Sequence, residues 1–231
     1  LGDVYKTHLI DLGSLFRSKH QIIFAKKVMV TVIFVLLLWY GGLFFQSFFL
    51  HRYAAHQVFT MSKTMERIMF ILTWVFQGSS YLSAYGYAIM HRMHHAYTDT
   101  ENDPHSPSHD PNLLAMMWKT KTIYQDINSE RIEIDQRFTK NVPQWKKFDL
   151  FAGSRFSRLL WISGYIVFFA FFATTWWQWS LLPVTFLMAP IHGVIINWFG
   201  HIYGYVNYTM KNTSKNLFRF DFLMMGEGYH N

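Results

Sequence analysis

Three histidines lie within five consecutive positions of the chain, at His91, His94 and His95. On an α-helix these positions are i, i+3 and i+4, so the three side chains project from one face of the helix. Imidazole nitrogens grouped in this way suit iron, zinc or copper. A solvated basic loop that is rich in histidine is the alternative interpretation. The metal interpretation therefore depends on whether further ligands occur elsewhere in the chain.

Further histidines occur in three more clusters. His51 and His56 follow a long apolar run at the spacing H-x4-H. On an α-helix such positions are ~140° apart, which predicts that the pair flanks two metals instead of chelating one. Asn197 and His201 form an N-x3-H pair, and the chain closes on G-E-G-Y-H-N, which contains His230. The sequence therefore offers enough imidazoles for more than one metal ion.

The composition indicates a membrane protein. Hydrophobic residues make up 51% of the 231 residues and charged residues only 15%, which is more apolar than a soluble domain needs. The chain has no cysteine, which excludes disulfides, thiolate metal ligands and a thiol nucleophile. We attribute the net charge of +7 to Lys/Arg-rich segments at a membrane surface and expect no nucleic-acid partner. We predict an all-α integral membrane protein with a cytosolic helical cap.

Apolar runs predict the positions of the helices that cross the membrane. Three spans are expected, at residues 28–50, 159–177 and 181–199. The first run has 23 uncharged residues, and at ~1.5 Å per residue it is long enough for a hydrocarbon core of ~30 Å. Residues 68–90 are also apolar, but Gln77-Gly78-Ser79-Ser80 interrupts them, which predicts an interfacial segment. Residues 91–158 and 201–231 are expected to form the cap of this single domain.

The spacing of the clusters predicts that they share one side of the membrane. Between His56 and His91 there are too few residues for two crossings of ~20 residues each. The hairpin 159–199 returns the chain to the same side, and no crossing separates Asn197 from His230. We expect this to be the cytoplasmic face. The basic segment before residue 28 would then lie on the opposite side, against the usual preference of Lys and Arg. Two explanations stay open: either a further membrane span precedes this segment, or the first apolar run enters the membrane as a bent, hairpin-like segment.

The order of these motifs resembles that of the membrane-bound fatty acid desaturases, particularly the acyl-CoA Δ9 (stearoyl-CoA-type) branch. The pattern of that family is H-x4-H, H-x2-H-H, N-x3-H and then G-E-G-[FY]-H-N-x-H-H. The resemblance runs from about residue 28 to the end of the chain. Because the chain begins with Leu1 and stops within the last motif, we interpret it as a fragment truncated within the third histidine box.

The resemblance implies a di-iron centre held almost wholly by histidine. The implied ligands are His51, His56, His91, His94, His95, His201 and His230, with Asn197 acting through a bound water. Two further histidines of the family pattern would follow Asn231, so we expect this chain alone not to hold both irons with native affinity.

Other polar residues are expected to support this centre or the substrate. Ligating histidines need hydrogen-bond partners that fix their orientation. The residues placed for this role are Asp99, Glu101, Asp103, Glu227 and, in the same D-P-H stretch, His105, with a solvated acidic turn as the alternative for the first three. Gln77 and Tyr87 are candidates for substrate binding, with core packing as the alternative. His192, inside the last apolar run, is expected to be a packed, hydrogen-bonded histidine.

The resemblance implies an O2-dependent desaturase that inserts a cis double bond, at Δ9, into a saturated acyl chain, with two electrons from an external carrier such as ferredoxin or cytochrome b5. The acyl carrier stays open between CoA, acyl carrier protein and a lipid, because residues 87–90 lack the Trp and charges of animal acyl-CoA members. The alternatives are a fatty acyl or lipid hydroxylase on the same histidine scaffold and a non-catalytic membrane metal- or lipid-binding protein. No H-E-x2-H motif of a zinc hydrolase is present.

Overall fold

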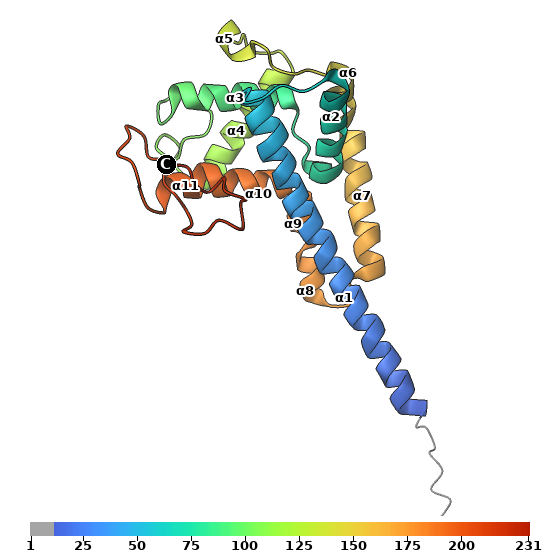
Figure 1. Ribbon diagram of the computed structural model, residues 1–231. Helices are drawn as coiled ribbons and strands as arrows, with labels where there is room; N and C mark the ends of the chain where they lie inside the picture. Colours follow the sequence, from blue (N-terminus) through green and yellow to red (C-terminus); the bar gives the residue numbers. More distant parts are fainter. Residues whose placement is uncertain (1–11) are drawn as a thin grey trace, which may run out of the picture.

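A computed structural model describes residues 12–231, and it shows one long helix that carries a cap of shorter helices (Figure 1). Within the described range the structure has no β-strand, only isolated bridges that join Asn216 to Tyr205 and Tyr229. This confirms the predicted all-α class. Residues 1–11, which belong to the basic segment expected before the first apolar run, lie outside the described residues.

The long helix is α1, Leu12–Phe45, which continues without a break into the π-helix η1, Gln46–Ala55. The stretch Lys19–Ala55 is long and apolar enough to cross a membrane. In Figure 1 the first half of α1 extends away from the rest of the molecule. The second half packs against the other helices on one side, and η1 brings the first histidine cluster into the cap.

The next apolar stretch forms two helices with a break between them. Helix α2 is Lys63–Gln77, the 3-10 turn η2 is Gly78–Ser80, and helix α3 is Ala84–Tyr97. Gly78 has φ +53°, and a Cβ at this position would lie 1.8 Å from the Tyr165 hydroxyl, so only glycine fits. The Ser83 side chain then caps α3 by accepting a hydrogen bond from the Gly86 N–H at 3.0 Å. The break between α2 and α3 thus falls at Gln77-Gly78-Ser79-Ser80, the polar residues that interrupt the apolar run in the sequence.

The cap is completed by three helices and held by one apolar core. These helices are α4, Leu113–Asn128, α5, Gln136–Thr139, and α6, Lys146–Ala152. Buried side chains of η1, α2 and α3 meet in the core, where Phe49, Phe70 and Ile89 are fully enclosed. Burying each such side chain contributes roughly 1.5–3 kcal/mol. This packing fixes η1 and His56, the residue that follows it, against α3, and these segments carry five of the histidines.

The remaining apolar sequence forms one helix that could cross a membrane and one bent segment. Helix α7, Arg155–Phe172, passes alongside α1, where the rings of Phe34 and Phe168 stack at 3.8 Å. The chain then returns through a series of short helices: α8, Trp176–Ser180, α9, Leu182–Phe186, α10, Met188–Val194, η3, Ile195–Phe199, and α11, Gly200–Ile202. This series bends by 78° between Phe186 and Met188.

Run 181–199 therefore differs from the straight second arm of a hairpin that the sequence predicts. Pro190 has no N–H, so the carbonyl of Phe186, four residues before it, loses its helical partner. The Ser79 hydroxyl donates to that carbonyl at 3.1 Å, and the Ala189 N–H donates to the Ser80 hydroxyl at 3.1 Å. The two serines of η2 thus satisfy the backbone of the bend, which turns α10 to α11 sideways beneath the cap (Figure 1).

Candidate metal centre

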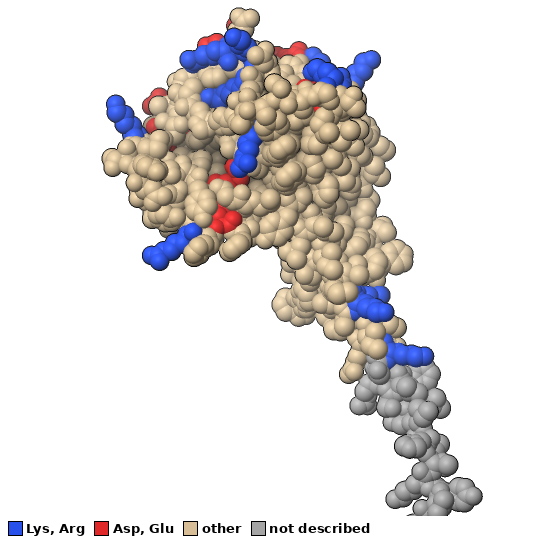
Figure 2. All heavy atoms as spheres, viewed as in Figure 1, with Lys and Arg blue, Asp and Glu red and all other residues tan. Residues whose placement is uncertain are grey.

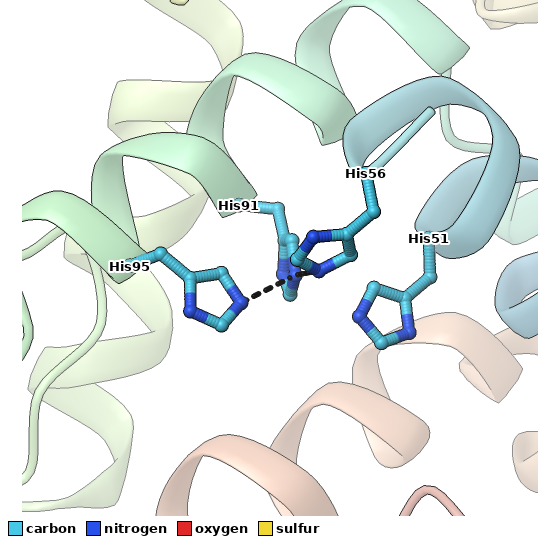
Figure 3. Close-up of side chains that lie close together, drawn as sticks. All are labelled: His51, His56, His91 and His95. Carbon is cyan, nitrogen blue, oxygen red and sulfur yellow. Dashed lines mark hydrogen bonds between the residues drawn. The ribbon is translucent and has the colours of Figure 1, made fainter. Parts of the chain in front are cut away.

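All seven histidines that the sequence proposes as ligands lie in two neighbouring groups. In the first group the ligand nitrogens lie within 4.8 Å of one another, and its members are His51, His56, His91 and His95. Figure 3 shows these four rings converging from η1 and α3. The second group obeys the same distance limit, and its members are His94, His201 and His230. Their role as ligands remains a prediction.

The π-helix explains how the first motif contributes two rings to one group. The His56 N–H donates to the His51 carbonyl at 3.0 Å, an i to i+5 hydrogen bond, and the two ring centroids are 4.7 Å apart. A wider π-helical turn brings residues five apart onto one face, whereas an α-helix separates them. The expectation that this pair flanks two metals is therefore corrected. It assumed α-helical geometry, in which the two side chains point apart, whereas in the π-helix both rings face the first histidine group.

Helix α3 divides the second motif between the two groups. His91 and His95 are one turn apart and their ring centroids lie 4.6 Å from each other. His94 is displaced around the helix toward His201, at 5.6 Å between centroids. The three side chains share one broad face, as predicted, but they do not converge on one point. A single helix thus serves both groups and fixes their separation.

The nitrogens that face one another have spacings suited to metal ligands. The Nε2 atom of His91 lies 2.9 Å from that of His56 and 3.0 Å from that of His95. In the second group the Nε2 atoms of His201 and His230 are 3.1 Å apart. Two nitrogens bound at right angles to one metal, each at ~2.1 Å, are ~3.0 Å apart. Both groups therefore fit a metal that prefers imidazole ligands.

Burial keeps several of these imidazoles, among them His91, His95 and His230, neutral at physiological pH. Burial lowers the pKa of His91 well below its usual value, and the neighbouring histidines lower it further. The same two causes lower the pKa of His95 to about 4 and that of His230 to about 3. Because metals bind the neutral form of histidine, the lone pairs are available without prior loss of a proton.

Hydrogen-bond partners on the opposite ring nitrogen orient three of the histidines. The Nδ1 atom of His51 lies 2.9 Å from a Glu227 carboxylate oxygen, and that of His94 lies 2.9 Å from an Asp103 oxygen. Such contacts fix the tautomer and direct Nε2 toward the centre of each group. Asp103 and Glu227 thus lie beside the histidines that the sequence pairs them with, by a hydrogen bond at His94 and by an ion-pair contact at His51; their roles remain predictions.

The partner of His201 is one that sequence reasoning missed. His201 Nδ1 lies 3.0 Å from the Thr213 hydroxyl, which donates in turn to Asp99 at 2.9 Å. Asp99 is in the left-handed region, with φ +60°, where a short polar residue is tolerated best. No motif marks Thr213, because only the folding of the loop after α11 brings it beside His201.

The two carboxylates also join separate parts of the chain. Burial would raise the pKa of Asp103, but its hydrogen bonds with His94 and the His105 N–H lower it, so it is ionised. Glu227 accepts a hydrogen bond from the Ser47 hydroxyl and contacts His51. These contacts join the G-E-G-Y-H-N motif at the end of the chain to the H-x4-H motif that contains His51.

Three further proposed residues lie near the histidines. The buried His105 ring stacks on His94 with centroids 4.4 Å apart, and together with Asp103 these two form a third group of potential ligands. Asn197 and Tyr87 line the cavity described below. The Tyr87 ring also stacks on His91 at 5.7 Å, so it lies directly beside the first group.

Two residues are placed differently from their expected roles. Gln77 is buried at the break after α2, where its Oε1 accepts from the Leu82 N–H at 2.9 Å, and it is absent from the cavity wall. Gln77 therefore supports the turn after α2, and its role in substrate binding remains a prediction. His192 packs against Trp39 at 4.5 Å between centroids, but neither ring nitrogen has a hydrogen-bond partner within residues 12–231. The expectation of a hydrogen-bonded His192 is wrong.

A single cavity of about 1610 Å³ opens onto both histidine groups. Its wall includes apolar side chains, among them Leu82, Ile162 and Phe186, and basic ones such as Arg155. Ligand pockets of ~300–1,000 Å³ are usual for drug-sized molecules, so this cavity has room for a longer ligand. The arrangement can place an extended, mostly apolar molecule beside two metal ions.

The Glu227→Gln variant is expected to bind metal roughly 10–100-fold more weakly, because a neutral amide supports the imidazole of His51 less strongly than a carboxylate does. Competition with a chelator measures the change. Glu130→Gln is the matched control, since Glu130 is exposed and pairs only with Lys146. Equal metal affinities of the Glu227→Gln and Glu130→Gln variants would show that Glu227 does not strengthen metal binding by His51.

The fold and the histidine groups together define a helical protein with candidate membrane spans and a cap whose histidine clusters are compatible with a metal site. The model of the family described as "Fatty acid desaturase" matches residues 28–231. The chain therefore belongs to the fatty acid desaturase family. This confirms the resemblance drawn from the motifs at the level of the family.

Curated relatives are similar at lower coverage. The chain is 39% identical to the hex-5-enoyl-[acyl-carrier protein] acetylenase of Moorena producens over 77 residues, which are 33% of this chain and 22% of that protein. It is 26% identical to the Delta-9 desaturase-like 5 protein of Arabidopsis thaliana over 195 residues, 80% of this chain and 58% of that protein. It is 28% identical to the sn-1 stearoyl-lipid 9-desaturase of Synechocystis sp. over 184 residues, which are 78% of this chain and 53% of that protein.

The chain thus spans little more than half the length of the two longer-matching relatives. No solved structure is significantly similar to it.

Proposed function

We propose that this chain forms the metal-binding core of an O2-dependent fatty acyl desaturase that inserts a cis double bond into a saturated acyl chain. The observation that carries the proposal is the pair of adjacent histidine groups on one cavity. Two iron ions, with O2 and two electrons from a carrier such as ferredoxin or cytochrome b5, would supply an oxidant strong enough for an unactivated methylene. Four histidines would hold one ion and three the other, with Asn197 contributing through water.

The residues of the chain then have two tasks. Neutral imidazoles provide the lone pairs, and Glu227, Asp103 and Thr213 keep three rings in the orientation that directs Nε2 inward. The apolar part of the cavity wall binds the acyl chain and excludes water from the reacting carbons. Tyr87, which stacks on His91, is positioned to contact the chain near the first group.

The substrate class is an acyl chain attached to a carrier, at the cytoplasmic face of the membrane. The names of the relatives include both an acyl carrier protein thioester and a stearoyl lipid. Two relatives are named as 9- or Delta-9-type desaturases, which supports Δ9 as the position of the double bond. We propose an acyl-CoA or another acyl thioester or lipid as substrate. The spans that hold this core in the membrane are proposed at 28–50, 159–177 and 181–199, the last one bent.

Expression of the gene in a host that lacks its own Δ9 desaturase tests the proposal. We expect new cis-monounsaturated fatty acids in the lipid profile, with the bond position read from dimethyl disulfide adducts. The His91→Ala variant should give none, because His91 is central to the first group. Hydroxylated products would instead identify a hydroxylase on the same scaffold. Iron-loaded protein that yields neither product would contradict an oxidative role.

A further inference from the structure

The segment 217–228 is a loop that its own backbone contacts hold in shape. The Asp221 carboxylate accepts three backbone hydrogen bonds, from Met224 at 2.8 Å, Gly226 at 3.1 Å and Gly228 at 2.7 Å. The Leu217 N–H donates to the Gly228 carbonyl at 2.9 Å and closes the base of the loop. The loop is therefore a defined element, although it contains no helix or strand.

The outer side of this loop is unusually apolar. Phe220 is 78% exposed and Phe222 81% exposed, and they flank the inward-facing Asp221. Leu223 and Met225 add further exposed apolar surface. The exposed charge of the loop is that of Arg219, which is positive. Apolar side chains gathered in this way on a surface mark a site of contact with a protein or a membrane.

The loop lies beside the helix that crosses the membrane. The Trp39 indole N–H donates to the Leu223 carbonyl at 3.0 Å, while Glu227 contacts Ser47 of the same long helix. Trp39 precedes Ser47 by eight residues, which is ~12 Å along the helix axis. From Glu227 to Leu223 the loop therefore descends along the Lys19–Ala55 span, away from the histidines.

The surface that surrounds the loop is continuous with the apolar face of α1. Leu36, Leu37 and Tyr40 are exposed on α1 on either side of Trp39. Figure 2 shows Lys and Arg side chains over the cap and at the foot of α1, and the stem between the cap and the foot shows none on this face. Acidic side chains and one further basic side chain lie at the lower left of the cap. The loop is attached to α1 through the hydrogen bond from Trp39 to the Leu223 carbonyl.

We propose that residues 218–225 form a second membrane contact, in which Phe220 and Phe222 insert into the bilayer beside the first span while Arg219 faces the headgroups. Large apolar side chains are stabilised within the bilayer, and a basic residue near them suits anionic lipids. The Leu223 carbonyl, which would otherwise be unpaired near the hydrocarbon, already has the Trp39 N–H as its donor. The contact would hold the segment that carries Glu227 and His230 at a fixed height above the membrane.

Spin labels at single cysteines test this contact, because the chain has no cysteine of its own. Phe220→Cys and Phe222→Cys leave the fold intact, since both side chains are almost fully exposed. The controls are Leu37→Cys on α1, 59% exposed on the membrane-spanning helix, and Val58→Cys, 67% exposed in the loop after η1. Each labelled protein is reconstituted in nanodiscs that contain anionic lipid.

The rate at which oxygen, which concentrates in the bilayer, relaxes each spin label is then compared with the rate for a water-soluble nickel chelate. At positions 220 and 222, as at position 37, we expect oxygen to relax the label faster than the nickel chelate does. At position 58 we expect the nickel chelate to relax the label faster. Greater relaxation by the nickel chelate at 220 and 222 would overturn the proposal, because the loop would face water. Protection from both reagents would also overturn it, because another protein segment would then cover the phenylalanines.

Discussion

The His94→Ala variant is expected to lose the metal ion of the second histidine group and all detectable desaturation. His94 faces His201 at 5.6 Å between ring centroids, and its removal reduces that group to two histidines. It also leaves the fully buried Asp103 carboxylate without the imidazole that it contacts at 2.9 Å. Asp103 would keep only the hydrogen bonds from the Asp99 and His105 N–H groups, so part of a buried charge would lose its partner, which is costly.

Metal content by plasma mass spectrometry and the fatty acid profile of the host measure this effect together. His20→Ala is the control, because His20 is exposed near the start of α1, far from both groups. The control should match the unsubstituted protein in both measurements. Unchanged metal content in His94→Ala would remove His94 from the proposed ligands, whatever the activity.

The Arg92→Ala variant is expected to lose metal from the first group although Arg92 is not a ligand. Its guanidinium donates to the carbonyls of Ala55 at 2.7 Å and Ala54 at 3.1 Å, which end the π-helix η1. It also donates to the carbonyls of Phe138 at 2.9 Å and Lys140 at 2.8 Å. Arg92 thus supplies donors to carbonyls that have no helical partner and places a positive charge at the end of η1.

Loss of these hydrogen bonds should lower the free energy of unfolding by on the order of 3 kcal/mol, because only some of the four carbonyls can turn to water. It should also loosen His51 and His56, which η1 carries, relative to His91 and His95 on α3. Thermal unfolding in detergent and metal content per chain measure the two effects. Arg131→Ala is the control, since Arg131 is exposed and pairs only with Asp126, and such surface pairs contribute ~1 kcal/mol or less.

Arg92→Lys separates positioning from charge, because lysine keeps the charge but cannot reach four carbonyls from one planar group. We expect it to retain part of the stability and to bind metal poorly. A lysine variant with full metal content would show that charge alone is sufficient and that the guanidinium does not position η1.

The sequence by itself determined the class of the fold and the chemistry of the site. Long uncharged runs such as 28–50 allow little except membrane helices. The absence of cysteine and the spacing of His51, His56 and His91 to His95 left imidazole as the dominant metal ligand. Asp103 and Glu227 could be proposed as partners because both lie within a few residues of a histidine motif. These inferences depend on residue type and local spacing, which a sequence displays directly.

Only the tertiary structure decided how the ligands are divided and supported. The π-helical turn that joins His51 to His56 differs from an α-helix by one hydrogen-bond register, and no residue in the motif specifies it. Thr213 joins His201 to Asp99, which precedes Thr213 by 114 residues, and Ser79 meets the carbonyl freed by Pro190, 107 residues further along the chain. Such contacts arise when distant elements pack together, so their partners cannot be read from local spacing. The histidine motifs supply the ligands, whereas the packing of η1, α3 and the closing segment determines which ligands face each other.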